Sequence, residues 1–251
     1  MNENLKKDQV HLWHMDLDSP LLKLEYIRDL LSTKELGRAD RYIDDRNRSR
    51  FLMGRGALRL ILSHYTQIDA DQLIFEYGPK DKPALAESYG DQRVSFNLSH
   101  SQDLALIAVA QRFRRIGVDV EKIRDLKQRQ NILERYFSKS EQAEYHALPD
   151  TQQLHAFFNL WSRKEAFVKA WGESIGSIKM NQLDVSFAPG ALARIRAVPD
   201  SFAAAKNWLM QDITVGPEYS CCLVAELLSP GETLTVQHFE FNSLRTDCPK
   251  I

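Results

Sequence analysis

Apolar and polar residues alternate in several short stretches of this chain, and each such stretch predicts a β-strand. Residues 104–110 are instead continuously apolar, which is typical of a strand buried on both faces. Other strands in the first part of the sequence are expected at residues 11–17, 73–77 and 94–99. In the second part strands are expected at residues 116–121, 183–187, 193–198, 208–215, 219–228 and 234–241.

Helical patterns separate these strands in both parts of the chain. Ser32 and Glu35 form a capping-box pattern, which predicts the start of a helix, and residues 51–65 then carry an apolar stripe at helical spacing. In the second part helices are expected near residues 128–147 and 152–171. Strand, helices and an antiparallel run thus occur twice, which predicts an α+β protein with two similar halves. The prediction places these halves at residues 1–114 and 115–251.

The composition is that of an ordinary globular protein. The 251 residues are 43% hydrophobic and 27% charged, and the net charge of −1 gives no global attraction to nucleic acid or membranes. No apolar run approaches the ~20 residues needed to span a bilayer, and the polar N-terminus is unlike a signal peptide. The 3 cysteines form neither a disulfide framework nor a zinc-binding spacing. We therefore expect a soluble, cytoplasmic protein.

Two segments about forty residues apart carry the most distinctive chemistry. Strand alternation places Asp119 and Glu121 on one face, roughly 6.6 Å apart along the strand. In the long helix that follows, Glu165 and Lys169 have i, i+4 spacing. Carboxylate oxygens without imidazole or thiolate suit Mg²⁺, and a lysine one turn away suits a phosphate oxygen. The pattern predicts a magnesium site at Asp119, Glu121 and Glu165, with Lys169 beside a phosphate.

The position of Lys164 on that helix strengthens this prediction. Lys164 falls in the middle of a broad apolar arc and Glu165 lies at its border, so both charges need partners. An alternative is a set of ordinary surface ion pairs at i, i+4 spacing, which the aromatic crowding of the helix disfavours. An acidic pair on a strand is by itself a weak signal, because solvated strand faces often carry one.

Two further segments could bind phosphate groups. Residues 97–101 are expected to end one strand and turn into the next, and Ser99 and His100 offer hydroxyl, imidazole and backbone donors there. The alternative for this segment is an ordinary hydroxyl-rich turn. Seven arginines crowd residues 38–59, and guanidinium groups suit bidentate phosphate recognition. Their commoner role is a solvated helix face with local Arg–Asp pairs.

Taken together and in this order, the segments resemble the Sfp-type 4′-phosphopantetheinyl transferases. The resemblance extends from about Leu31 to Phe187. Its motifs are Asp45-Arg46-Asn47-Arg48-Ser49-Arg50, Lys82-Pro83-Ala84-Leu85, Phe96-Asn97-Leu98-Ser99-His100-Ser101, Gly117-Val118-Asp119-Val120-Glu121, Phe137-Ser138 with Glu141, and Trp161-Ser162-Arg163-Lys164-Glu165-Ala166 with Lys169. Each motif alone is weak, whereas all of them in the family's order are a strong signal.

The resemblance implies the 4′-phosphopantetheinyl transferase fold, with two pseudo-symmetric α+β halves and the active site at their interface. Coenzyme A would be held between the halves. Asp119, Glu121 and Glu165 would be the ligands of Mg²⁺. The first half would contact the 3′-phosphate and adenine of coenzyme A, and the second would supply the magnesium site and the catalytic helix.

The resemblance also implies contacts with the phosphates of coenzyme A. Ser99, His100 and Lys169 would contact these phosphates, and Arg50 would join His100 at the 3′-phosphate. Arg38 is a looser match to another basic phosphate contact.

The adenine contacts are expected in the loop that contains Lys82 and Pro83, which would lie along the ring. The family usually has Gly-Lys-Pro in this loop, whereas here Asp81 takes the place of the glycine. Asp81 lacks the backbone freedom of glycine, so the loop departs from the family pattern at this position.

The implied reaction transfers the 4′-phosphopantetheine of coenzyme A to a serine of an apo acyl or peptidyl carrier protein, as in fatty-acid, polyketide or nonribosomal-peptide synthesis. The serine hydroxyl attacks the pyrophosphate phosphorus that bears the pantetheine arm, and adenosine 3′,5′-bisphosphate leaves. Mg²⁺ would stabilise the developing charge. Glu165 is expected to act as general base, directly or through a metal-bound water. Lys169 would stabilise the phosphates, and Lys164 would support them or Glu165.

Two other classes of protein remain open from the residues alone. A coenzyme A or nucleotide-binding regulator would use Arg50 and His100 but has no need of three aligned carboxylates. A magnesium-dependent hydrolase of a nucleotide pyrophosphate would explain the carboxylates, although no obvious water-activating histidine lies near them in the sequence. Because the chain holds two halves, a monomer is expected, unlike the short, trimeric holo-carrier-protein synthases.

Overall fold

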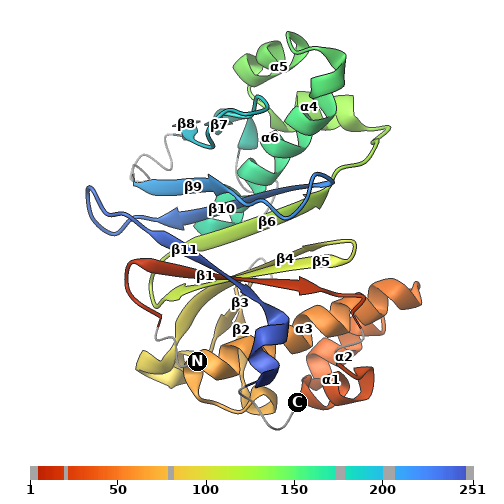
Figure 1. Ribbon diagram of the computed structural model, residues 1–251, viewed down its shortest axis with the longest axis vertical. Helices are drawn as coiled ribbons and strands as arrows, with labels where there is room; N and C mark the ends of the chain where they lie inside the picture. Colours follow the sequence, from red (N-terminus) through yellow and green to blue (C-terminus); the bar gives the residue numbers. More distant parts are fainter. Residues whose placement is uncertain (1–4, 20–21, 79–81, 173–178, 200–206, 247–251) are drawn as a thin grey trace. The chain divides into compact units, whose positions relative to one another are not determined.

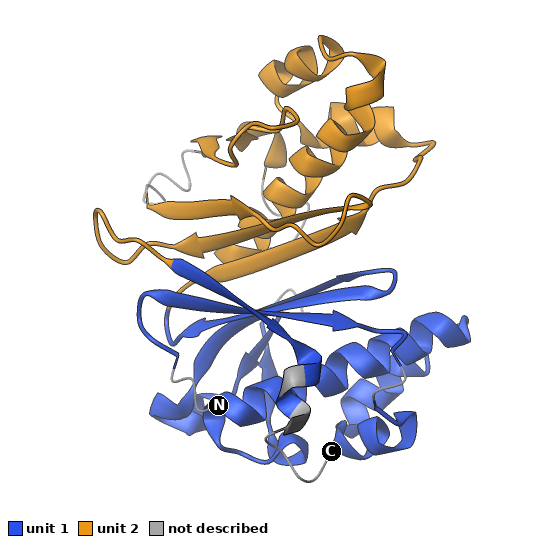
Figure 2. Cartoon of the chain, in the orientation of Figure 1, with its two compact units in different colours: residues 1–113, 235–251 blue, residues 114–234 orange. Residues whose placement is uncertain are grey.

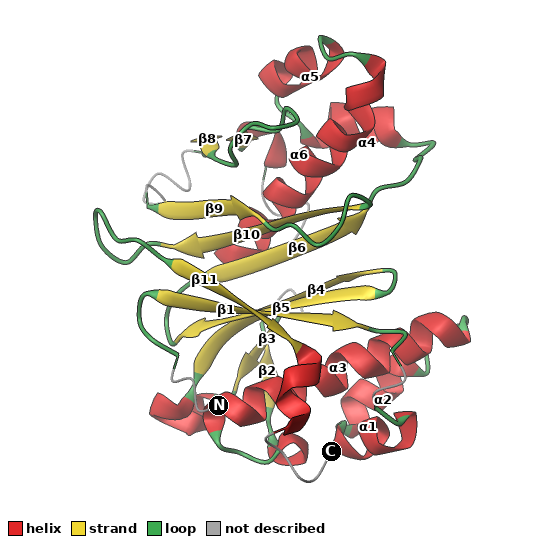
Figure 3. Cartoon of the chain, in the orientation of Figure 1, coloured by secondary structure: helices red, strands yellow, loops and turns green. Residues whose placement is uncertain are grey.

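The computed structural model describes residues 5–19, 22–78, 82–172, 179–199 and 207–246 (Figure 1). The chain divides into two compact units, residues 1–113 with 235–251 and residues 114–234 (Figure 2). Both units combine helices and strands (Figure 3), which confirms the predicted α+β class. None of the helices in the described residues has the length and apolar character needed to cross a membrane. The cytoplasmic location stays a prediction.

The first unit is built on a sheet with the strand order β11-β1-β5-β4. Strand β5 (Leu104–Gln111) pairs antiparallel with β1 (Gln9–Asp16) and with β4 (Val94–Ser101). Its α-helices are α1 (Leu24–Leu30), α2 (Thr33–Ala39) and α3 (Asp45–Thr66). The smaller elements are η1 (Ala70–Gln72), β2 (Phe75–Tyr77), β3 (Pro83–Leu85) and η2 (Glu87–Gln92).

The second unit is built on a sheet with the strand order β6-β10-β9. Strand β10 (Tyr219–Glu226) pairs antiparallel with β6 (Ile116–Lys122) and with β9 (Trp208–Asp212). Its α-helices are α4 (Arg129–Tyr136), α5 (Lys139–His146) and α6 (Asp150–Trp171), so the single helical stretch expected near 128–147 is two helices. The smaller elements are η3 (Met180–Gln182), β7 (Asp184–Val185) and β8 (Ile195–Ala197).

The two units repeat one order of elements. In each, a first strand is followed by two short helices, a long helix of 22 residues, a small two-stranded sheet and an antiparallel pair of strands. In the first sheet β5 lies between β1 and β4, and in the second sheet β10 lies in the same way between β6 and β9. This shared order confirms the predicted repeat of two α+β halves.

Strand β11 (Thr235–Glu240) departs from the repeat. It pairs in parallel with β1, and η5 (Phe241–Thr246) then contributes Phe241 and Leu244 to the core of the first unit. The described residues from Thr235 onward therefore belong to the first unit, which corrects their predicted place in a second half at 115–251. Alternation along this segment predicted a strand, but it carries no information about the distant strand with which it pairs.

Each unit anchors its long helix through a similar capping box. Ser32 caps α2 and Ser138 caps α5, and Glu35 or Glu141 three residues later accepts a hydrogen bond from the backbone N–H of that serine. Both glutamates are buried, and each forms an ion pair with a cation on the long helix of its unit. The helix start predicted at Ser32 is confirmed.

Candidate active site

The carboxylates of the second unit lie where β6 packs closely against α6. Gly117 permits this approach, because a Cβ atom there would lie 2.1 Å from the carbonyl oxygen of Ala166 and 2.4 Å from the nitrogen of Ala170. Side chains alternate along a strand, so Asp119 and Glu121 share the helix-facing side of β6 with Gly117. The strand therefore directs both carboxylates toward the helix that carries the other predicted residues.

Lys169 and Asp119 form an ion pair between these two elements. The Nζ of Lys169 lies 2.6 Å from Oδ1 of Asp119 and also donates to the carbonyl oxygen of Val118 at 3.4 Å. Asp119 is only 3% exposed, and a buried carboxylate requires a partner of this kind. Two of the predicted site residues are thus brought into direct contact.

Glu165 is the electrostatically unusual member of the cluster. Its side chain is buried, and its Oε1 has no hydrogen-bond partner among the described residues. Burial and the nearby charges of Asp119 and Glu121 raise the pKa of Glu165 to about 8, against the opposing effect of Lys169. A carboxyl group in such surroundings is unfavourable when ionised, and a nearby cation would stabilise its charged form.

The donor set of this cluster fits a hard divalent cation. Mg²⁺ takes oxygen ligands and is usually held by one or two carboxylates together with substrate phosphates and waters. Within the described residues, no group of three or more His, Cys, Asp or Glu side chains is already arranged to hold a metal ion. In this structure the ammonium group of Lys169 is what neutralises Asp119.

Lys164 has a structural role, and the predicted contact of this residue with a ligand phosphate is not compatible with its burial. Its side chain is 0% exposed, and its Nζ lies 2.6 Å from Oε2 of Glu141. It also donates to the carbonyl oxygens of Met180 at 2.8 Å, Leu183 at 2.6 Å and Tyr136 at 3.3 Å. These acceptors occupy the donors of the ammonium group, so Lys164 joins α6 to α5 and η3.

Arg50 is held by an acidic residue of the first unit. Its guanidinium group donates to both oxygens of Asp18, at 2.8 and 2.6 Å, and to the side-chain oxygen of Gln102 at 3.2 Å. The hydrogen bonds from Arg50 hold the pKa of Asp18 well below its usual range. The structure thus supplies a carboxylate as the partner of Arg50, and the predicted contact with a 3′-phosphate stays a prediction.

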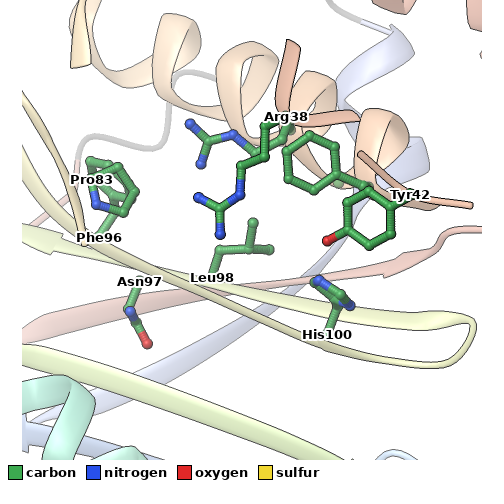
Figure 4. Close-up of a pocket in the computed structure, with 10 residues that line it drawn as sticks. Arg38, Tyr42, Pro83, Phe96, Asn97, Leu98 and His100 are labelled. Carbon is green, nitrogen blue, oxygen red and sulfur yellow. The ribbon is translucent and has the colours of Figure 1, made fainter. Parts of the chain in front are cut away.

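A pocket of about 180 Å³ in the first unit brings together three predicted residues, Arg38, Pro83 and His100. Figure 4 shows Arg38 and Tyr42 approaching from the side of the helices, and Leu98 and His100 approaching from β4. The remaining lining residues are Phe51, Gly54, Arg55, Phe96 and Asn97. The pocket therefore combines aromatic surface with arginine and histidine side chains.

Sequence reasoning did not identify Tyr42 or Phe96 as pocket residues. A signal was present for both. Tyr42 follows Arg38 by four residues, and Phe96 shares one face of its strand with His100 because side chains alternate. The spacing of Tyr42 from Arg38 and of Phe96 from His100 therefore indicates that each pair lies on one face of its element.

The segment from Asn97 to Ser101 is part of β4, and it does not form the predicted turn. Ser99 pairs with Leu106 and His100 with Ala105 in the antiparallel register. The actual turn consists of residues 102–103, with φ of 55° at Gln102. Because side chains alternate, Ser99 and His100 lie on opposite faces of the strand, so they do not form one cradle on the same side.

Lys82 directly precedes β3, and its side chain is partly exposed. Asp81, which departs from the glycine of the family pattern, lies outside the described residues. The adenine contact expected of Lys82 stays a prediction, whereas Pro83 lies at the pocket that contains Arg38 and His100.

Comparison with protein families identifies matches in both units. Residues 115–224 match the 4′-phosphopantetheinyl transferase superfamily, and residues 20–112 match the N-terminal region of 4′-phosphopantetheinyl transferases. Together these matches include the capping boxes, the pocket of the first unit and the carboxylates of the second.

Individual relatives agree with this result. The chain is 37% identical to the 4′-phosphopantetheinyl transferase HetI of Nostoc sp. over 198 residues, which is 79% of this chain and 82% of that protein. It is 32% identical to a putative 4′-phosphopantetheinyl transferase of Synechocystis sp., covering 77% of this chain and 75% of the relative. It is 27% identical to the 4′-phosphopantetheinyl transferase Sfp of Bacillus subtilis, covering 89% and 96%.

Proposed function

We propose that this chain, which belongs to the 4′-phosphopantetheinyl transferase superfamily and transfers the 4′-phosphopantetheinyl group to carrier proteins, takes this group from coenzyme A. In the same proposal, Asp119, Glu121 and Glu165 hold Mg²⁺. The Sfp-type transferase predicted from the sequence is confirmed as the family. The observation that carries the magnesium site is Glu165, buried with an unpartnered oxygen among the described residues and with a pKa raised to about 8.

The proposed chemistry assigns separate tasks to the carboxylates and the lysine. When bound at the three carboxylates, Mg²⁺ would supply charge stabilisation for the pyrophosphate. Glu165 would accept the proton of the attacking serine hydroxyl, directly or through a water, once a cation has lowered its pKa. Lys169, which contacts Asp119, would donate to a phosphate oxygen when that contact opens. Adenosine 3′,5′-bisphosphate leaves, and most of the rate acceleration comes from positioning and electrostatics.

We assign the 3′-phosphate and adenine of coenzyme A to the pocket in the first unit. Arg38 provides a planar guanidinium group and His100 an imidazole at the same pocket, which suits a phosphate. Tyr42, Phe51 and Pro83 provide flat and apolar surface, which suits a purine ring. Arg50 is not among the residues that line this pocket, and its guanidinium group pairs with Asp18, so its contact with the 3′-phosphate stays a prediction.

We assign part of the carrier-protein contact to the basic segment after β6. Arg124, Lys127 and Arg135 are exposed and follow closely on the strand that carries the carboxylates, with Asp125 and Glu134 as the acidic residues between them. Carrier domains are small and often acidic, and opposite charges steer association. The presence of both α+β units in this one chain supports the prediction of a monomer.

One assay tests the proposed function. The chain is incubated with coenzyme A, Mg²⁺ and an apo carrier protein, and the carrier is then weighed by mass spectrometry. We expect the mass of one phosphopantetheinyl group to be added, and chelation of Mg²⁺ to prevent it. Release of adenosine bisphosphate without carrier modification would favour a hydrolase, and absence of both would favour a binding protein. Parallel rates on fatty-acid, polyketide and nonribosomal-peptide carriers then identify the preferred partner.

A further inference from the structure

Three polar side chains meet inside the contact between α6 and β10. The Oγ atoms of Ser162 and Ser220 lie 2.9 Å apart, and the Oγ of Ser220 donates to Oδ1 of Asn159 at 3.0 Å. Asn159 in turn donates from Nδ2 to the carbonyl oxygen of Phe187 at 3.4 Å. The Oγ of Ser162 also donates to the backbone carbonyl oxygen of Asn159 at 3.4 Å. These hydrogen bonds form one buried network between α6 and β10.

This chain of hydrogen bonds lies beside the carboxylates on both elements. Ser162 precedes Glu165 by three residues on α6, and residues at this spacing are neighbours on a helix surface. Ser220 is the cross-strand partner of Glu121, and the next pair on the same face includes Asp119. The network thus joins the helix that carries Glu165 to the strand that lies alongside the other two carboxylates.

The network is sensitive to the position of the helix in a way that apolar packing is not. Both serines are buried, and a buried hydroxyl left without a partner is destabilising by about 1–3 kcal/mol. A slide of α6 by one residue would move it about 1.5 Å along its axis and break these contacts. Hydrophobic contacts around the network are non-directional and resist such a slide less strictly. The hydrogen bonds therefore help to fix the height of α6 on the sheet, together with the ion pairs of Lys169 with Asp119 on β6 and of Arg163 with Asp212 on β9.

We propose that Asn159, Ser162 and Ser220 are positioning residues that set the separation of Glu165 from Asp119 and Glu121, and thereby favour Mg²⁺ over the larger Ca²⁺. The inference rests on the proposed function, because it takes these carboxylates as the metal ligands. Mg²⁺ demands near-ideal octahedral geometry at about 2.0–2.1 Å, whereas Ca²⁺ accepts flexible geometry at about 2.3–2.6 Å. Loosening the helix should therefore weaken Mg²⁺ binding more than Ca²⁺ binding.

The test is calorimetric titration of Mg²⁺ and Ca²⁺ into the full chain saturated with coenzyme A, without a carrier protein. We expect Ser220→Ala to weaken Mg²⁺ binding about tenfold, in the range found for residues that orient metal ligands, and Ca²⁺ binding by clearly less. Ser220→Thr, which keeps the hydroxyl, should restore much of the Mg²⁺ affinity. Thr66→Val is the matched control, because it removes a buried hydroxyl that bonds only within the first unit.

Ser162→Ala gives a second, independent variant, which carries the test if Ser220→Ala does not fold. Because both serines act in one network, the double variant should lose little more Mg²⁺ affinity than the more affected single variant. Wild-type Mg²⁺ affinity in both single variants, or an equal loss for Mg²⁺ and Ca²⁺, would overturn the inference alone. Failure of the wild-type chain to bind Mg²⁺ would instead overturn the proposed metal site, and the inference with it.

Discussion

The two units use the same capping box to hold their long helices, but with different cations. In the first unit, Arg55 and Arg59 each place a guanidinium nitrogen 2.7 Å from one oxygen of Glu35. In the second, Glu141 pairs with the single Lys164 at 2.6 Å. Burial acts to raise the pKa of both carboxyls, yet the two arginines hold the pKa of Glu35 below its usual value. Burial raises the pKa of Glu141 despite its lysine partner.

The helix-facing sides of the first strands differ further. On β1, Nδ1 of His11 and Nε1 of Trp13 both contact the hydroxyl of Tyr65 on α3, at 2.7 and 2.9 Å. The corresponding side of β6 carries the carboxylates Asp119 and Glu121. The scaffold is thus repeated where the helix is anchored, and it differs where the strand faces the helix. In the first unit the helix-facing side of β1 packs against α3. In the second unit the same side of β6 carries charged groups that suit a ligand.

Removing the two capping-box carboxylates is the strongest test of this comparison. We expect Glu35→Gln to lower the free energy of unfolding by about 3–5 kcal/mol at neutral pH, because it leaves two buried arginines that cannot deprotonate. Glu141→Gln should lower it by only about 1–3 kcal/mol, because Lys164 keeps three carbonyl acceptors and can lose its proton. Chemical denaturation measures both values, and equal losses would contradict the distinction.

The pH dependence of the same variants has a definite sign. The pKa of Glu35 is lowered by folding, so its contribution is present above the usual pKa and is lost as the pH falls through the folded-state value. The difference between wild type and Glu35→Gln should therefore shrink in acid. Because the pKa of Glu141 is raised, its ionisation weakens the folded state as the pH rises above the usual value. The difference in unfolding free energy between wild type and Glu141→Gln should therefore not shrink as the pH falls.

Glu165→Gln separates function from stability in the second unit. We expect transfer to fall about 10³-fold, since a general base typically contributes 10²–10⁴-fold. The pKa of Glu165 is raised to about 8, so the metal-free wild type should lose stability as the pH rises from the usual carboxyl pKa toward that value, and the variant should not. Thermal denaturation at pH 9 without metal should therefore show the variant as the more stable protein. Glu144→Gln, which changes a carboxylate paired with Arg196, is the control expected to keep full transfer.

One glycine in each unit shows how closely neighbouring elements pack there. A Cβ atom at Gly117 would meet the backbone of α6, at 2.1 Å from the carbonyl oxygen of Ala166, whereas the nearest atoms to one at Gly56 belong to the side chain of Ile27, at 2.5 Å. We expect Gly117→Ala to destabilise the chain by about 3 kcal/mol or more, and Gly56→Ala by about 1 kcal/mol, partly offset by better helix propensity. Thermal unfolding of both variants measures the difference. A milder effect at Gly117 than at Gly56 would show that β6 can move away from α6.

Local patterns in the sequence were sufficient to predict most of the fold. Alternation predicted the strands and the shared face of Asp119 and Glu121, and the serine–glutamate spacing predicted the start of α2. The parallel pairing of β11 with β1 could not be predicted in this way, because periodicity within a segment does not specify a distant partner. The turn expected near His100 was misplaced because residues 102–103 alone make the hairpin turn.

The candidate site was only partly predictable for a similar reason. Lys164 was correctly expected to need a partner for its charge. That partner is Glu141, and the other acceptors include the carbonyl groups of Met180 and Leu183. Glu141 precedes Lys164 and Met180 and Leu183 follow it, at separations that no helix or strand period specifies. Ser162 and Ser220 lie 58 positions apart in the sequence, and no local pattern indicates that their hydroxyl groups meet.

The smallest expected effect tests the division of roles between the two units. Arg38 lines the first-unit pocket, and we expect Arg38→Ala to reduce kcat/KM for coenzyme A about tenfold through the loss of a charge-assisted phosphate contact. Its kcat/KM for 3′-dephospho-coenzyme A should change little. Arg41→Ala is the matched control, because Arg41 is exposed and does not line that pocket.

The most direct measurement of the central claim is the ratio of kcat/KM for coenzyme A to that for 3′-dephospho-coenzyme A, determined by the mass of the modified carrier protein. We propose that the first unit binds the 3′-phosphate and that the second unit binds Mg²⁺. We therefore expect wild type to prefer coenzyme A, Arg38→Ala to lose most of this preference, and Asp119→Asn to keep the preference while both rates fall. A preference that disappears in Asp119→Asn but persists in Arg38→Ala would contradict the account.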